Sequence, residues 1–123
     1  MKRIILTFVA LSALFISCDK YYYNQLYIIN NCNEVISVSI TDTWNNVDTF
    51  SVEANTTFMF NEGEGITKPK MIIEYSFVKF EVTKNEVISK INYRDFKRWT
   101  YIEKDKYHSK LYLPINPEDF EDE

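Results

Sequence analysis

Along most of the chain, hydrophobic and polar residues alternate with a period of two, the periodicity of a β-strand with one buried face. In the clearest case, Ile36, Val38 and Ile40 alternate with two serines. Comparable runs occupy 26–29, 49–53, 58–60, 71–82, 87–91, 99–101 and 107–115. Turn-forming residues separate these runs about every eight to twelve residues, which predicts an all-β fold. We expect an antiparallel, immunoglobulin-like β-sandwich of about seven to nine strands without a helix, the likeness being one of architecture only.

Three segments add detail to this pattern. Within 71–82 the apolar residues change parity, so we expect a bulge or a break near Phe77 and Val78. The segment 61–69 contains both glycines and one proline, which predicts a loop. Pro114 interrupts the last run, and proline cannot donate to a β-ladder, which predicts an edge position for that strand.

The first residues have a different pattern, typical of a secretory signal. Lys2 and Arg3 are followed by an apolar run over 4–16, interrupted only by Thr7 and Ser12. A run of this length is too short for a membrane span, which needs about 20 residues. A positive start followed by a short apolar run matches a signal peptide.

The end of this run resembles the lipobox of bacterial lipoprotein signal peptides. Phe15-Ile16-Ser17-Cys18 places a small residue before a cysteine, with Phe15 where an aliphatic residue is usual. The resemblance implies cleavage before Cys18, acylation of Cys18 with palmitate or a similar chain, and a membrane as the partner of that lipid. We therefore expect a signal peptide at 1–17, a tether at 18–24, a β-sandwich domain at 25–116 and a disordered acidic tail at 117–123. The tyrosines before Asn24 either lie at the lipid headgroups or begin the first strand.

The rest of the chain resembles a set of small uncharacterised lipoproteins of Gram-negative gut bacteria. The similar segments are 27–31, 99–103 and 112–120. The resemblance implies a lipid-anchored β domain of the cell envelope, with the outer membrane as the expected location and its leaflet left open. It implies no known activity, so no functional residue is carried over from it.

Cysteine and charge content exclude several classes of function. Lipid on Cys18 leaves Cys32 unpaired, and its alternation with Leu26 and Ile28 predicts a buried thiol. One cysteine and one histidine cannot form a metal or redox motif, so we expect no cofactor and no metal. Removing the signal changes the net charge from −4 to −6, which disfavours nucleic acid as a partner.

Catalytic machinery is not expected. His108 is the only histidine, and its parity predicts a position on the outer face of the last strand. Glu62 and Glu64 could form a carboxylate pair or a calcium site, but eighteen acidic residues produce such pairs by chance. We therefore predict that the protein is not an enzyme.

Two groups of residues are candidates for binding. Trp44 lies in a polar stretch with Asp42, Asn45 and Asn46, where its ring could bind the face of a sugar while its neighbours bond the hydroxyls; alternatively it covers the end of the sandwich. A basic cluster lies beside Trp99 and could contact anionic lipid or acidic glycan, or could be a solvated loop. Its members are Arg94, Lys97 and Arg98.

Two functions without catalysis remain open at this point. The first is an accessory or interaction domain that docks on a larger envelope protein through a strand edge or the basic cluster. The second is a carbohydrate- or peptide-binding module that uses Trp44 and its polar neighbours. The sequence favours the first, because no residue besides Trp44 marks a concave site, and it leaves the identity of the partner open.

Overall fold

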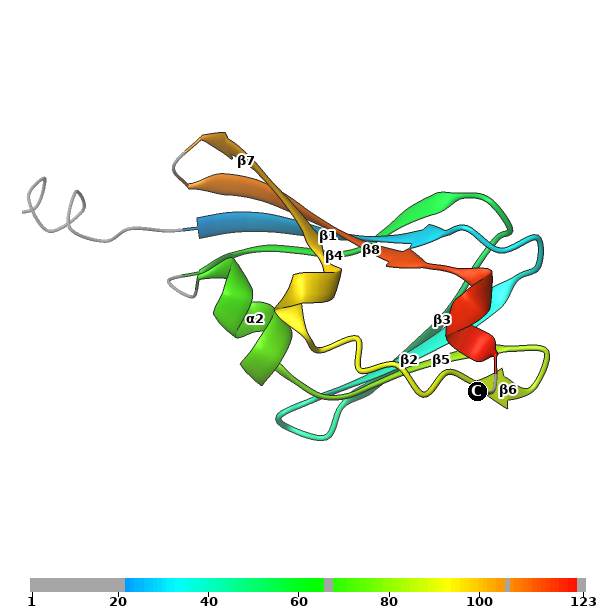
Figure 1. Ribbon diagram of the computed structural model, residues 1–123. Coiled ribbons are helices and arrows are strands. Elements are labelled where there is room, and N and C mark those ends of the chain that lie inside the picture. Colours follow the sequence, from blue (N-terminus) through cyan, green and yellow to red (C-terminus); the bar gives the residue numbers. More distant parts are fainter. Residues whose placement is uncertain (1–21, 66–67, 106, 122–123) are drawn as a thin grey trace, which may run out of the picture.

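The computed structural model describes residues 22–65, 68–105 and 107–121, and it confirms the predicted sandwich. Two four-stranded sheets pack face to face (Figure 1). The eight strands fall within the predicted range, and the two-sheet architecture is the one that the alternation indicated. The lipobox residue Cys18 lies outside the described residues.

The first sheet has the strand order β4-β1-β8-β7. Its strands are β1 (Tyr22–Asn30), β4 (Thr57–Gly65), β7 (Thr100–Asp105) and β8 (His108–Ile115). β1 and β8, the first and last strands, pair in parallel, whereas β1–β4 and β7–β8 are antiparallel. This sheet is therefore mixed rather than wholly antiparallel.

The second sheet has the order β3-β2-β5-β6 and is antiparallel throughout. Its strands are β2 (Ile36–Asp42), β3 (Val47–Val52), β5 (Phe77–Lys84) and β6 (Val87–Ile88). A tight turn joins β5 to β6, with Asn85 and Glu86 at positive φ. Two 3-10 helices, η1 (Phe96–Arg98) and η2 (Pro117–Phe120), lie outside the sheets.

The core lies between the inner faces of the two sheets, where the alternating apolar residues meet. Its fully buried aliphatic side chains include Ile28, Ile36, Val38, Val82, Leu111, Leu113 and Ile115. At one end of this core the rings of Phe60, Phe77, Phe80 and Trp99 pack together. The Trp99 indole N–H donates to the carbonyl of Tyr93 at 2.8 Å, which satisfies its one polar group.

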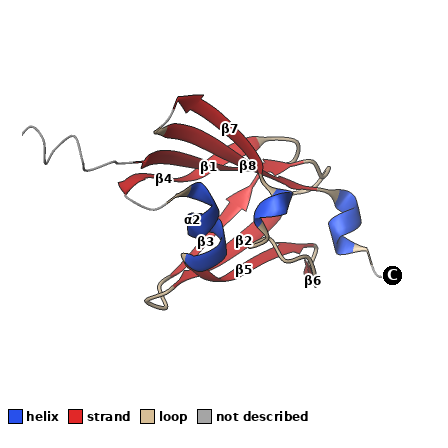
Figure 2. Cartoon of the chain, turned by 60° about the vertical axis from the view of Figure 1, so that its left-hand side comes forward, coloured by secondary structure: helices blue, strands red, loops and turns tan. Residues whose placement is uncertain are grey.

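The prediction that the chain has no helix is wrong. Residues 69–75 form α2 (Pro69–Tyr75), which lies between the two sheets at the end where β1 begins (Figures 1 and 2). Pro69 is suited to a first helical turn, where its missing N–H is not needed. Pro69 and Ile73 are both buried, four positions apart on one side of the helix.

The expected irregularity at 77–78 is confirmed. β5 begins at Phe77, and its register with β2 shifts where Thr41 pairs with Lys79 and Asp42 with Phe77. Val78 is the extra residue in this bulge and is exposed. The change of parity thus has two sources, a helix-to-strand transition followed by a bulge.

Three predicted boundaries are wrong. β1 begins at Tyr22, so the second alternative for the tyrosines holds for Tyr22 and Tyr23, and 22–24 belong to the sheet rather than to a tether. Residues 61–65, predicted as a loop, continue β4, because their backbone pairs with the first half of β1 despite the two glycines. The segment 117–120 is helical rather than disordered, since a capping box at Asn116 begins η2 and Phe120 packs against the core.

Pro114 does not make β8 an edge strand, because β1 and β7 flank β8. The carbonyl of Ile115 accepts from the N–H of Asn31, so the backbone polar groups of Ile115 point toward β1. Those of the preceding residue, Pro114, point toward the side of the other neighbouring strand. On that side β7 begins at Thr100, which pairs with Tyr112. Pro114 therefore lies beyond the end of β7, where its missing N–H leaves no ladder bond unmade.

Cys32 is buried, as its alternation predicted, and its thiol is free. Burial raises the pKa of this thiol above its usual value. We therefore regard Cys32 as an inert core residue.

The side chain of Asn30 joins the two sheets at the end opposite α2. It is fully buried, and its amide donates to the carbonyls of Glu34, Val52 and Glu53 at 2.9, 3.1 and 3.2 Å. Its carbonyl accepts from the N–H of Cys32 at 2.9 Å. One side chain thus satisfies backbone groups of the loop after β1 and of the end of β3.

We expect Asn30→Ala to destabilise the fold strongly, since it leaves these buried backbone groups without partners. The expected loss is roughly 3 kcal/mol of unfolding free energy. Asn33→Ala, which changes an exposed asparagine of the same turn, should cost no more than about 0.5 kcal/mol. Urea unfolding followed by fluorescence of the buried Trp99 measures both; equal midpoints for the two variants would contradict this role of Asn30.

Candidate interaction surface around Trp44

Trp44 lies at the tip of the β2–β3 hairpin and is the most exposed large hydrophobic residue of the described chain, with 82% of its surface accessible. The turn is tight, with Asn45 at φ 64°. Asparagine tolerates this left-handed conformation better than most residues. Trp44 therefore does not cover the core and presents its ring to the surroundings.

The Asp42 side chain fixes this turn. Its Oδ1 accepts from the N–H groups of Trp44 and Asn46 at 2.8 and 2.9 Å, and its Oδ2 accepts from the Asn46 side-chain amide at 3.2 Å. The Asn46 backbone N–H, followed by the other two donors, holds the pKa of Asp42 below its usual value. Two of the polar neighbours that could bond sugar hydroxyls, Asp42 and Asn46, are thus engaged in shaping the hairpin.

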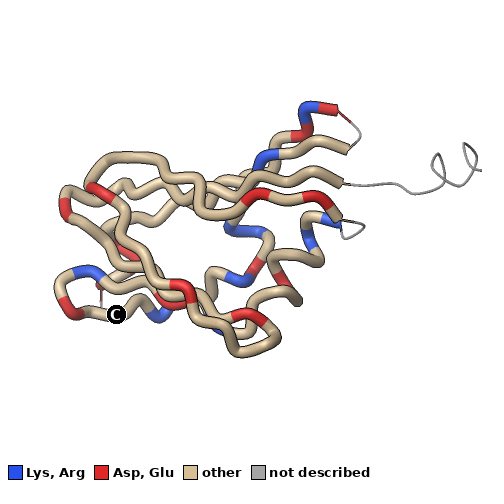
Figure 3. The backbone as a smooth tube through the Cα atoms, turned by 180° about the vertical axis from the view of Figure 1, so that it is seen from behind, with Lys and Arg blue, Asp and Glu red and all other residues tan. Residues whose placement is uncertain are grey.

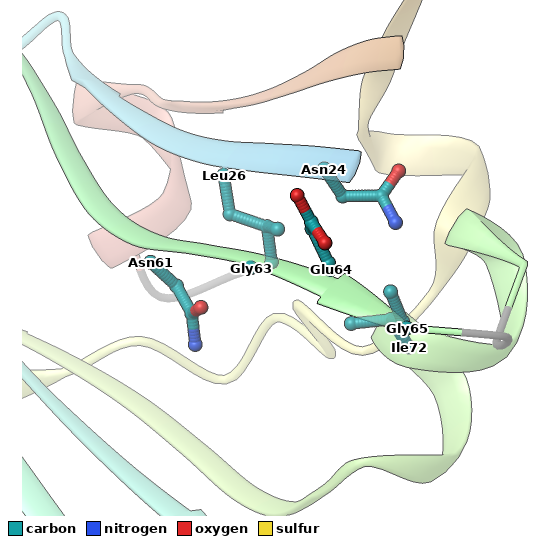
Figure 4. Close-up of a pocket in the computed structure, with 7 residues that line it drawn as sticks. All are labelled: Asn24, Leu26, Asn61, Gly63, Glu64, Gly65 and Ile72. Atoms are coloured by element: carbon teal, nitrogen blue, oxygen red, sulfur yellow. The ribbon is translucent and has the colours of Figure 1, made fainter. Parts of the chain in front are cut away.

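Two hollows lie along the open side of the sandwich next to this hairpin. One, of about 200 Å³, is bordered by Asp42, Asn46 and Phe60. The other, of about 190 Å³, lies between the start of β1, the end of β4 and α2 (Figure 4). Asn61 borders both. Each is smaller than the roughly 300 Å³ at which pockets for small organic ligands begin.

More apolar surface is exposed at the same end of the molecule. After Trp44, the most exposed large hydrophobic residues among those described are Tyr75 at the end of α2 and Val47 at the start of β3, at 68% and 63%. The sequence pattern singled out neither residue: 71–77 was expected to be strand up to a bulge or break near Phe77 and Val78, so the helix that exposes Tyr75 was not foreseen. The signal that could have identified the helix, and with it Tyr75, is Pro69 followed by the apolar Ile73 four positions later. No comparable signal marks Val47.

The predicted basic cluster is not a single exposed surface. Arg94 donates to the carbonyls of Glu74 and Val78 at 3.1 and 3.3 Å, so its guanidinium bonds to α2 and β5. Lys97 and Arg98 lie exposed on η1. Lys and Arg segments alternate with Asp and Glu segments over this end of the molecule (Figure 3). Arg94 is thus engaged by two backbone carbonyls, and a contact of the cluster with an anionic surface stays a prediction.

The structure places the candidate acid–base residues on the outer face of the first sheet. His108 is exposed and its Nδ1 lies 2.8 Å from Asp105 Oδ1. Its neighbour Ser109 faces the interior and donates to the buried Asn24, so this hydroxyl lies away from the imidazole. Glu62 accepts from the Tyr23 hydroxyl at 2.6 Å, which raises the pKa of Tyr23.

Within 22–65, 68–105 and 107–121, no three His, Cys, Asp or Glu side chains are arranged to hold a metal ion. No helix among these residues has the length and apolar character needed to cross a bilayer. Comparison with protein-family models, curated proteins and solved structures found no match.

We expect Asp42→Ala to loosen the β2–β3 turn, with several-fold faster amide hydrogen exchange at Trp44 and Asn46 after correction for intrinsic rates. Because the pKa of Asp42 is lowered in the folded state, the carboxylate stabilises the turn at neutral pH, and this stabilisation is lost as the pH falls through that lowered pKa. Asp48→Ala, in the neighbouring strand, is the control and should leave both amides protected. Unchanged protection in Asp42→Ala would exclude this role.

Proposed function

We propose that this chain is a non-catalytic, lipid-anchored protein of the bacterial cell envelope that serves as an accessory or interaction domain. The anchor is supported by the positive start, the apolar run and the lipobox ending at Cys18. The described fold begins at Tyr22, so a single domain follows almost directly on the cysteine. This arrangement suits a domain that acts close to a membrane.

The observation that carries the interaction role is the exposure of β7. All six of its residues are exposed, so the second sheet covers neither of its faces, and β7 is an edge strand of the first sheet. Tyr101 and Ile102 contribute apolar surface. A strand with an unpaired edge and apolar side chains can accept a strand from a partner protein.

The hydrogen-bond pattern identifies which residues of β7 face this free edge. The backbone N–H and C=O of Ile115 point toward β1. Because these groups alternate sides along a strand, those of Tyr112 and Lys110 point toward β7. Their partners Thr100 and Ile102 must then face β8. The N–H of Tyr101 therefore points away from the sheet and is available to a partner strand.

Trp44 supports a second candidate, a carbohydrate- or peptide-binding module. Its ring is exposed, and aromatic rings bind sugar faces. Its neighbours Asp42 and Asn46 border a hollow together with Phe60. This candidate is weaker, because Asp42 and Asn46 bond to one another and to the turn. Both candidates are compatible with a lipid anchor.

Labelling with radioactive palmitate tests the anchor. We expect label on the wild-type protein and on Cys32→Ala, which removes the other cysteine, and none on Cys18→Ala. Cys18→Ala should also be released in soluble form. Absence of label from the wild type, or its retention in Cys18→Ala, would show that the anchor assignment is wrong.

Tyr101→Pro tests the β7 edge, because it removes an outward N–H and leaves the β7–β8 ladder intact. We expect a protein partner recovered from membranes in fixed stoichiometry with the wild type and with Tyr101→Ser, and at least about tenfold less with Tyr101→Pro, as expected when strand addition is blocked. Trp44→Ala should retain the partner. If Trp44→Ala instead abolishes binding to a glycan panel and no protein partner depends on Tyr101, the second candidate is correct.

A further inference from the structure

The three most exposed large hydrophobic side chains of the described chain gather at one end of the sandwich. They are Trp44, Tyr75 and Val47, and Met71 and Val78 at the same end are also exposed. Single exposed apolar residues are common on protein surfaces, but a group of this size marks a contact surface. We call these five residues the apolar end.

Strand pairing brings the members of the apolar end together. Asp42, at the base of the Trp44 turn, pairs with Phe77, two residues beyond Tyr75. Thr41 pairs with Val47 on one side and with Lys79 on the other. The hairpin tip, the end of α2 and the start of β5 therefore lie next to one another.

The chain enters the fold at this same end. The first strand begins beside α2, because Asn24 of β1, Gly65 of β4 and Ile72 of α2 border one hollow (Figure 4). Figures 1 and 2, in views 60° apart, both show the start of β1, α2 and the β2–β3 hairpin at one end, with β6 at the other.

The length of chain between the lipobox and the fold limits how far this end can lie from a membrane. Tyr22 follows Cys18 by four residues. Even fully extended, four residues span at most about 14 Å. With lipid on Cys18, the start of β1 must stay within that distance of the headgroup region, and the apolar end lies at the same end of the domain as the start of β1.

We propose that the apolar end docks on the surface of the bilayer that holds the anchor, with Trp44 and Tyr75 at the headgroup level. This proposal rests on the lipid anchor proposed above. Tryptophan and tyrosine are enriched at this depth, where their rings meet acyl chains and their polar atoms meet water. Val47, Met71 and Val78 add aliphatic surface around them.

The charges at this end indicate docking through apolar contact rather than attraction to anionic lipid. Lys70 and Lys79 lie within 4.0 and 3.1 Å of the carboxylates of Glu74 and Glu81. The carboxylate of Asp42 also lies here. With mixed charges, the docked state should be insensitive to salt, unlike that of a polybasic surface.

Quenching by brominated lipid tests the proposal on the full lipid-anchored protein. The protein is reconstituted into vesicles of phosphatidylethanolamine and phosphatidylglycerol that contain phosphatidylcholine brominated near the headgroup. We expect the brominated lipid to quench most of the Trp44 emission. The emission that remains should be shifted to the blue relative to the soluble Cys18→Ala protein. High salt should reverse neither effect. In Trp44→Phe only Trp99 emits, and because Trp99 is buried its emission should not be quenched.

A matched variant controls for general proximity to lipid. Trp44→Phe combined with Val87→Trp moves the exposed tryptophan to β6, at the opposite end of the sandwich. The emission of the tryptophan at position 87 should not be quenched, and its maximum should stay at the wavelength of a solvent-exposed tryptophan. Equal quenching of the two tryptophans would show that the domain has no preferred orientation and would overturn the proposal.

The remaining outcomes separate docking from anchoring. Palmitate on Cys18 with Trp44 unquenched would overturn docking and leave the anchor standing. Absence of palmitate would overturn both. A shift of Trp44 emission on adding a glycan panel to the soluble protein, without quenching by brominated lipid, would assign the ring to a ligand site instead.

Discussion

The chain crosses from the first sheet to the second within 31–35. The fold depends on how the backbone N–H and C=O groups of this segment are hydrogen-bonded. Asn31 still bonds to β8, but other backbone groups of this crossing have no strand beside them, and buried polar groups without partners are costly. The Asn30 side chain supplies the missing bonds to Glu34, Cys32 and the end of β3. Because it bonds to both sheets, it fixes where one lies over the other, and the inward faces of β1 and β2 can then meet.

Alternation predicted the parts of the fold in which one face of a strand is buried. Ile36, Val38 and Ile40 of β2, and Leu111 and Leu113 of β8, point inward as their parity indicates. It could not predict parts that depend on distant partners. In β4, Gly63 and Glu64 are held in a strand by their pairing with Asn24 and Tyr23, which no local signal reveals.

The helix was missed for a different reason. Met71, Ile73 and Tyr75 follow a period of two along the sequence, the spacing of a strand with one buried face. In the helix only Pro69 and Ile73, four positions apart, are buried, and Met71 and Tyr75 are exposed on the other side. The helix is favoured because it buries Ile73 completely between the sheets. The position of Trp44 on a polar turn was predictable, but its grouping with Tyr75 and Val47 follows only from the strand directions.

The parallel pairing of β1 with β8 has a consequence for how the molecule is made. A chain synthesised from its N-terminus presents β1 first, and the strand that covers one of its edges comes last, more than 80 residues later. Until β8 emerges, Leu26 and Ile28 lie on a strand with one open edge. Contacts so distant in sequence slow folding. The incomplete chain is therefore the state in which this protein is most open to aggregation, and any factor that holds it unfolded until synthesis ends would act chiefly by protecting that edge.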